Sequence, residues 1–225
     1  MQFLLDYRDE NDRPYRLEDI PKMLIFFSHA LVENTGFATT HFVYNMAGYP
    51  NVRARLYEEQ QQVIAKHGTA FSTEALEDMK YMDACLRETL RANTHPLGTA
   101  RKAMQDHTFS NGLSIPAGRK CMIHTYVVNR NADVYDNADE YNPDRIAGQP
   151  RTHSTSLGPD YVTFGLGRHA CPGRHFLSAQ MKMFMSVILR RYDFATKSGQ
   201  RPKSKTQDGY FVPAEEPITF MPRGV

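Results

Sequence analysis

A lone cysteine, Cys171, stands in a stretch whose residue types and spacing could hold a metal-bearing ligand. The stretch runs from Phe164 to Gly173 and reads FGLGRHACPG. Its first two glycines let the backbone take positive φ and pass close to a flat ligand. Pro172 suits the first turn of a following helix, whose N–H groups and positive end would favour the thiolate over the thiol. A thiolate held in this way is a good axial ligand for haem iron. The alternative is a small buried core residue, which a lone cysteine usually is.

A second group of polar residues interrupts an apolar stretch near the N-terminus. Residues 17–49 continue through apolar side chains until Gly48 and Pro50, a pattern that predicts a helix of about thirty residues. Its first half is apolar nearly all round, so we expect a buried central helix. Glu33 lies in its middle, and a buried carboxylate is costly unless it is paired or used. Pairing with His29, one turn back, is the alternative to a functional role.

The third set of residues that could do chemistry is the pair Glu88 and Arg91, on a helix predicted over residues 73–92. Residues three apart share a helix face and can pair. By spacing alone this is a surface ion pair of little worth. Cys85, on the same helix, is interpreted as a core residue.

The elements between and after these groups follow from turn and periodicity signals. Asn51 is expected to cap a helix that ends at Gly68, with a solvated charged face that includes Arg53 and Glu59. Strands at 108–109, 113–115 and 121–124, the last including His124, form a small β-region over 100–125. Residues 131–160 are predicted to be an irregular connector. After Cys171 a helix, within 164–192, carries one apolar face and several basic positions: Leu177, Met181, Phe184 and Ile188, against Arg174, Lys182, Arg190 and Arg191.

Length and composition exclude several classes of protein. The chain has 225 residues, a net charge of +2 and three cysteines. Balanced charge argues against a nucleic-acid binder. An odd number of cysteines argues against a disulfide framework and fits a reducing compartment, and no cysteine pair has the spacing of a zinc site. We expect no signal peptide, because Asp6 interrupts the apolar start of the chain. We expect no membrane-spanning segment, because the longest apolar run, Met23 to Val32, is too short.

The cysteine stretch resembles the haem-ligand loop of the cytochrome P-450 family, Phe-x-x-Gly-x-His-x-Cys-x-Gly. Further stretches resemble family motifs in the family's order: the oxygen-activation motif at 30–35, Glu-x-x-Arg at 88–91, and the arginine loop at 141–146. The His at 169 is similar to the fungal variant. The resemblance covers the chain from Ile20 to its end, as one partial domain over 1–225. It implies a mainly α fold with a small β-region, the C-terminal half of the cytochrome P-450 fold.

The resemblance also implies a role for each matching residue. Cys171 would be the metal ligand of haem b (iron protoporphyrin IX), with Phe164 and Gly173 in its loop. Arg101 and His169 would hold the propionates. Glu33, Asn34 and Thr35 would form the catalytic proton network, although Asn34 replaces a hydroxyl and a carboxamide cannot release a proton. Glu88, Arg91 and Arg145 would form a buried structural triad.

The implied activity is that of a haem-thiolate monooxygenase, which inserts one oxygen atom of dioxygen into an apolar organic substrate. Its electrons would come from an NADPH-cytochrome reductase-type donor, which the basic helix face would suit. The alternative is that this face is simply a solvated basic helix. Full-length relatives would lie on the cytoplasmic face of the endoplasmic reticulum. Substrate contacts would come from residues 94–100 and 210–212. Two alternatives remain: a haem-thiolate isomerase or dehydratase, which Asn34 favours, and a truncated, non-catalytic remnant.

Overall fold

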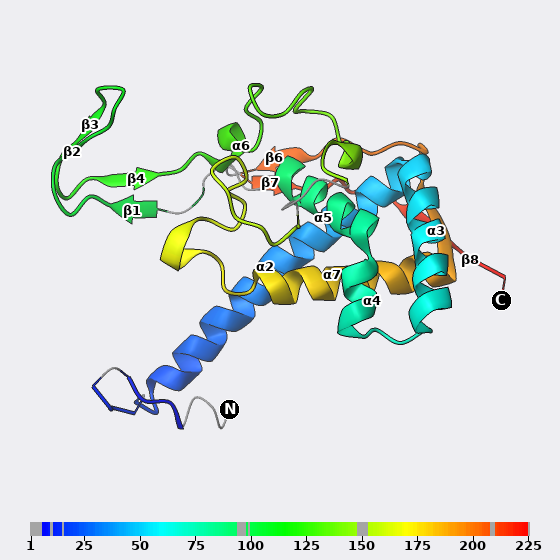
Figure 1. The fold of residues 1–225 in the computed structure, drawn as a ribbon, viewed down its shortest axis with the longest axis horizontal. Helices are drawn as coiled ribbons and strands as arrows, with labels where there is room; N and C mark the ends of the chain where they lie inside the picture. Colours follow the sequence, from blue (N-terminus) through cyan, green and yellow to red (C-terminus); the bar gives the residue numbers. More distant parts are fainter. Residues whose placement is uncertain are drawn as a thin grey trace. The chain divides into compact units, whose positions relative to one another are not determined.

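The computed structural model describes residues 6–9, 11–14, 16–93, 98, 100–147, 153–207 and 210–224. The described chain is mainly helical with small antiparallel two-stranded sheets, which confirms the predicted fold class (Figure 1). It divides into two compact units, Met1–Thr39 and Thr40–Val225. Among the described residues, no helix combines the length and the apolar character needed to cross a membrane.

Helix α2 spans Asp19–Gly48 and has 30 residues, close to the predicted bounds. The expectation that it is buried throughout is wrong. Phe42 and Met46, in its second half, are almost fully buried, whereas Phe26 and Val32 are 67% and 74% exposed. An apolar pattern specifies a helix, but burial also needs elements that cover it, and in the described chain most of the first half lacks that cover, although Ile20 at its start is buried.

Four helices gather in the second unit and bury a common core (Figure 1). They are α3 (Pro50–His67), α4 (Thr73–Asp78), α5 (Lys80–Ala92) and α7 (Arg174–Arg191). Their shared interior is filled by sulfur-containing and aliphatic side chains: Leu56, Met79, Met82, Cys85, Leu86, Met181, Met185 and Leu189. Cys85 is thus a core residue, as predicted, and burial raises the pKa of its thiol.

Two helix starts differ from the prediction. Helix α3 begins at Pro50, after Tyr49, so Asn51 is not its cap; proline suits the first position of a helix because it lacks an N–H to satisfy. The predicted helix over 73–92 breaks at Met79 into α4 and α5. The first turn of α5 is capped from another helix, because the Glu59 carboxylate accepts the backbone N–H groups of Tyr81 (2.5 Å) and Met82 (3.0 Å). Burial raises the pKa of Glu59, which therefore does not belong to a solvated face.

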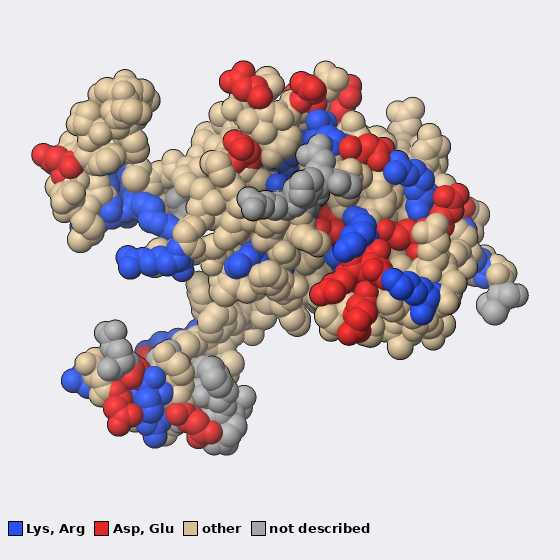
Figure 2. All heavy atoms as spheres, in the orientation of Figure 1, with Lys and Arg blue, Asp and Glu red and all other residues tan. Residues whose placement is uncertain are grey.

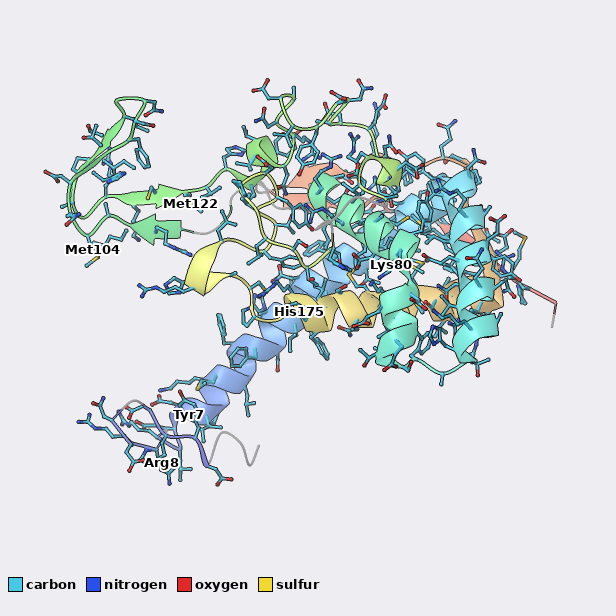
Figure 3. All side chains as sticks on the ribbon, viewed as in Figure 1. Tyr7, Arg8, Lys80, Met104, Met122 and His175 are labelled. Atoms are coloured by element: carbon cyan, nitrogen blue, oxygen red, sulfur yellow. The ribbon has the colours of Figure 1, made fainter. Side chains whose placement is uncertain are left out.

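The predicted β-region consists of two hairpin ladders joined end to end. Strand β1 (Ala100–Lys102) pairs with β4 (Lys120–Met122), and β2 (His107–Thr108) pairs with β3 (Ser114–Ile115). Figure 2 shows Lys and Arg side chains gathered on the β1–β4 ladder, and in Figure 3 the exposed Met104 and Met122 project from the same region. His124 is not a strand residue, since it caps the short helix α6 (Thr125–Val128).

Residues 131–160 form a connector of turns with one short 3-10 helix, η1 (Pro143–Arg145), where they are described. A second 3-10 helix, η2 (Gly167–His169), lies before Cys171.

Helix α7 buries a different face from the predicted one. The buried positions are Ser178, Met181, Lys182, Met185, Ser186 and Leu189. Phe184 is 46% exposed, and Lys182 points inward. The predicted apolar stripe and the buried stripe share only Met181, and the inward position of Lys182 is occupied because its ammonium pairs with the buried Asp83.

The C-terminal segment returns to α2 through a close backbone contact. Strand β5 (Tyr192–Thr196) pairs with β8 (Ile218–Pro222), and β6 (Lys205–Gln207) pairs with β7 (Tyr210–Val212). Arg201, in the segment between β5 and β6, packs against Gly48 of α2. A Cβ added at Gly48 would lie 2.2 Å from the backbone nitrogen of Arg201. Only glycine permits this approach.

We expect Gly48→Ala to lower the free energy of unfolding by about 1–3 kcal/mol, because the backbone at Arg201 must move. Gly36→Ala is the matched control on the same helix, since a Cβ there meets nothing within 4 Å. That control should stabilise by about 0.5–1 kcal/mol through helix propensity. Urea unfolding of both variants is the measurement, and equal effects would contradict the close contact.

Candidate cofactor-binding site

The loop from Phe164 to Cys171 is closed by its own backbone and presents the thiol outward. The Cys171 N–H donates to the Phe164 carbonyl at 2.8 Å, and Phe164 is buried beneath. Gly165 and Gly167 take φ of 72° and 67°, the positive values that their type predicts. Cys171 itself is exposed. The loop therefore offers a sulfur to a ligand that lies over its surface.

Helix α7 begins three residues after Cys171, with Gly173 as its N-cap. The prediction that Pro172 lies in the first turn of this helix is therefore wrong, since Pro172 precedes the N-cap. Arg174 donates through Nη1 to the Cys171 carbonyl at 2.9 Å, which fastens the loop to the helix.

Two further cationic side chains that the sequence assigns to the site are exposed. Arg101 lies on β1, where its Nη1 donates to the carbonyl of Ala100 at 2.9 Å. His169 lies on η2 and accepts through Nε2 from Arg168 Nε at 3.2 Å. In the part of the chain that the structure describes, neither forms an ion pair with a carboxylate. Both remain able to bind external carboxylates.

Glu33, Asn34 and Thr35 lie on α2 in the first unit, whereas Cys171 lies in the second. Glu33 Oε2 is 2.9 Å from His29 Nε2, the pairing that the sequence allows as an alternative. Asn34 donates through Nδ2 to the Ala30 carbonyl at 3.0 Å. Both polar groups are therefore engaged by their own helix.

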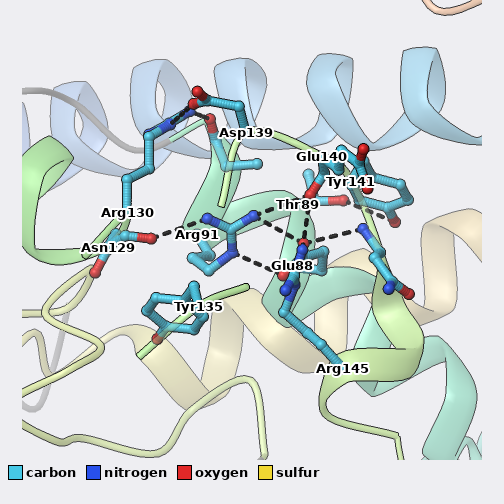
Figure 4. A network of polar contacts seen from close by, with 12 residues as sticks. Glu88, Thr89, Arg91, Asn129, Arg130, Tyr135, Asp139, Glu140, Tyr141 and Arg145 are labelled. Atoms are coloured by element: carbon cyan, nitrogen blue, oxygen red, sulfur yellow. Dashed lines mark hydrogen bonds and ion pairs between the residues drawn. The ribbon is translucent and has the colours of Figure 1, made fainter. Parts of the chain in front are cut away.

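Glu88 lies at the centre of a buried polar network (Figure 4). Arg91 donates to both of its carboxylate oxygens at 2.8 Å, and Arg145 Nε donates to Oε1 at 3.0 Å. The backbone N–H of Asn142 adds a fourth donor at 3.0 Å. The structure therefore brings together the three residues of the predicted triad, and a charge that would be costly alone is compensated on both oxygens.

A second buried ion pair was not anticipated from the sequence. Asp83 on α5 and Lys182 on α7 are 2.8 Å apart, with side chains 7% and 9% exposed. Ser154 donates to the same carboxylate through its N–H and its hydroxyl, both at 2.8 Å, and its Oγ is 2.8 Å from that of Ser178. Burial raises the pKa of Asp83, but Lys182 and Ser154 outweigh that effect and hold it below its ordinary value. The signal for this pair was a lysine at a core position of α7.

No group of three His, Cys, Asp or Glu side chains within the described ranges is placed to hold a metal ion. An exposed cysteine thiol can serve as a protein ligand to the iron of a prosthetic group such as haem. Residues 94–97 and 99, in the expected substrate-contacting segment, lie outside the described residues, as do the side chains of Tyr210 and Phe211.

A family model described as "Cytochrome P450" matches residues 1–221, almost the whole chain. The chain belongs to the cytochrome P-450 family. Among its curated relatives, the cytochrome P-450 monooxygenase cheE of Chaetomium globosum is 31% identical over 207 residues, which cover 87% of this chain and 40% of that protein. The monooxygenase esdpI of Penicillium shearii is 33% identical over 195 residues, covering 83% of this chain and 37% of its own.

The fold agrees with this assignment. A solved structure of a cyanobacterial cytochrome P-450, CYP120A1 with retinoic acid bound, aligns with a TM-score of 0.84 at 23% identity and covers 98% of this chain and 50% of its own. The chain spans about two fifths of the length of the curated relatives that it matches. The predicted family and its fungal character are confirmed by these relatives.

We expect Glu88→Gln to lower the free energy of unfolding by about 3–5 kcal/mol, because the buried arginines lose their counter-charge. Asp144→Asn is the matched control, since Asp144 forms an exposed ion pair with Arg55 at 2.8 Å. Such pairs contribute about 0–1 kcal/mol. Denaturant unfolding followed by circular dichroism measures both, and a small loss in Glu88→Gln would show that the network is dispensable.

A pH dependence follows from Asp83. A carboxyl whose pKa is lowered in the folded state stabilises fully above its ordinary value of 3.8, and this stabilisation is lost as pH falls through the folded pKa. We expect Asp83→Asn to be clearly less stable than the parent at pH 7, and the difference to shrink below about pH 4. Unfolding free energies between pH 3 and 7 provide the test. A gap that stays constant with pH would rule out the ion pair as its source.

Proposed function

We propose that this chain carries the haem-thiolate centre of a monooxygenase that inserts one oxygen atom of dioxygen into an apolar organic substrate. The observation that carries the proposal is the exposed Cys171 thiol on a self-closed loop at the start of α7. Family membership supports the reaction class, since the fungal relatives cheE and esdpI are named as cytochrome P-450 monooxygenases.

The residues of the loop and of β1 fit haem b. Cys171 would ligate the iron, with Phe164 below the loop and Gly173 beside the sulfur. Arg101 and His169 would hold the two propionates, a role that suits their exposed, carboxylate-free ends. When bound, haem supplies the activation of dioxygen and the oxidation of the substrate. The protein's part is to hold the sulfur as an anion and to orient the ring plane.

In this proposal, residues of α2 supply the protons for the reaction. Glu33 can carry a proton on its carboxylate and Thr35 can relay one through its hydroxyl, whereas Asn34 can only donate or accept a hydrogen bond. Protons would therefore pass through Thr35 or water and not through the side chain of Asn34. The exposed His29–Glu33 pair is weak enough to open for this purpose.

The electron donor would be of the NADPH-cytochrome reductase type, acting at the cytoplasmic face of the endoplasmic reticulum. The basic face of α7 supports donor docking less than its sequence indicates. Lys182 is buried against Asp83, and Arg190 donates to Gln60 and to the Thr69 carbonyl. The exposed Arg168 on η2, three residues before Cys171, is a better contact for an acidic partner.

A haem-thiolate isomerase or dehydratase is the second candidate. It is favoured by Asn34, whose amide replaces a proton-carrying hydroxyl and binds the backbone of its own helix. Such chemistry needs no protonated dioxygen, so product formation in the absence of an electron donor distinguishes it from monooxygenation.

The proposal is tested by the reduced, carbon-monoxide-bound difference spectrum of the chain reconstituted with haem. We expect a strongly red-shifted Soret band that is lost in Cys171→Ala, because the thiolate alone donates its electron density to iron. Cys121→Ala, which removes a half-buried thiol on β4, is the matched control and should keep the band. Absence of haem uptake, or a band indifferent to Cys171, would reject the proposal for this chain.

A further inference from the structure

We propose that Asn129 is a positioning residue that fixes the chain leading into the Cys171 loop. The inference rests on the proposed function, because it concerns the geometry with which that loop presents its sulfur. No motif pointed to Asn129 in the sequence. It is fully buried, directly after α6, and lies beside Arg91 in the polar network of Figure 4.

Every kind of polar group on Asn129 has a partner. Its backbone carbonyl accepts from Arg91 Nη1 at 2.9 Å, and its N–H donates to the carbonyl of Thr125 at 2.9 Å. Its side chain reaches the other way: Oδ1 accepts the Val162 N–H at 3.1 Å, and Nδ2 donates to Thr163 Oγ1 at 3.0 Å. One residue thus joins the Glu88–Arg91 pair to the segment just before Phe164.

From that segment the contacts continue into the loop. The Val162 carbonyl accepts the Gly165 N–H at 2.9 Å. Two residues after Val162, the Phe164 carbonyl accepts the Cys171 N–H at 2.8 Å. At its C-terminal end the loop is fastened to α7 by Arg174, which donates to the Cys171 carbonyl at 2.9 Å. At its N-terminal end it departs from a buried arm, residues 160–163, so the placement of Phe164 depends on that arm.

Other contacts hold the same arm from its outer side. The Arg87 guanidinium lies 3.8 Å from the centre of the Tyr161 ring, and Tyr135 donates its hydroxyl proton to the Asp160 carbonyl at 2.7 Å. Neither contact fixes the peptide plane of Val162. Asn129 does, because a planar amide presents an acceptor and a donor side by side to two consecutive residues.

Removal of the amide leaves a buried N–H without a partner, which costs more than the hydrogen bond itself contributes. In Asn129→Ala the arm loses its anchor while Arg91 keeps its bond to the backbone carbonyl of residue 129. The triad and the arm are thereby uncoupled without any change of charge.

The first test uses the haem-free chain and amide hydrogen exchange. In Asn129→Ala we expect the amides of Val162, Gly165 and Cys171 to exchange roughly tenfold faster, relative to amides in α5 and α7. Asn45→Ala is the matched control. Its amide is also almost fully buried and accepts from Arg201 and donates to Thr89, away from the arm. It should speed exchange near Arg201 and leave the three loop amides unchanged.

Milder variants keep the test valid if Asn129→Ala does not fold. Asn129→Asp keeps an acceptor for the Val162 N–H and should rescue slow exchange at that amide. Thr163→Val removes only the hydroxyl that faces Nδ2 and should speed exchange at the loop by a smaller factor. If all three variants leave the loop amides as slow as in the parent, Asn129 does not position the loop.

The second test uses the haem-loaded chain. In Asn129→Ala we expect the red-shifted Soret band of the carbon-monoxide adduct to weaken in favour of a band at shorter wavelength, with Asn129→Asp recovering it in part and Asn45→Ala keeping it. A parent chain that takes up no haem would reject the proposed function, and the exchange results would still decide the role of Asn129. A parent that binds haem, with a band unaffected in Asn129→Ala, would overturn the inference alone.

Discussion

The buried carboxylate of Glu88 is the constraint on which the rest of the second unit depends. A charge with its side chain 1% exposed must be compensated in full, and four donors from α5 and the connector do so. The guanidinium groups that supply three of them have further N–H groups to satisfy, and these bind backbone carbonyls at residues 129, 136, 137 and 140. A single buried charge thus orders a connector that has almost no regular secondary structure of its own.

Helix α5 carries two buried acids, and they point to different neighbours. Glu88 holds the connector, whereas Asp83, five residues earlier, holds Lys182 of α7 and Ser154. The segment from Ser154 to Val162 leads into the cysteine loop, and both of its ends are attached to α5, Ser154 directly through Asp83 and Val162 through Asn129 and Arg91. This arrangement explains how a loop whose sulfur and cations are exposed keeps a defined shape. The restraint lies in the buried arm and the surface stays open.

The sequence predicted those features that depend on local spacing or on a specific motif. Helix α2, the glycine conformations around the loop and the core role of Cys85 all followed from residue type and period. Asp83 and Lys182 lie 99 residues apart, so no periodicity could pair them; the available signals were a lysine between Met181 and Met185 and an acid beside Met82 at core positions of their helices. Asn129 gave no signal at all, because a buried amide is recognised by its partners and those are set by the fold.

The expected burial of α2 failed for a related physical reason. A helix that is apolar on every side is stabilised by burial. The hydrophobic free energy of burial is gained only where other elements pack against the helix, as they do at Phe42 and Met46. On the exposed half, Glu33 and Asn34 satisfy themselves within their own helix, through His29 and the Ala30 carbonyl. Exposed contacts of this kind are weak, about 0–1 kcal/mol for the ion pair, and exchange readily for water or another partner. The contacts of Glu33 and Asn34 within their own helix therefore do not prevent a role in proton transfer. The Asn34 side chain is nevertheless unsuited to that role, because a carboxamide cannot release a proton.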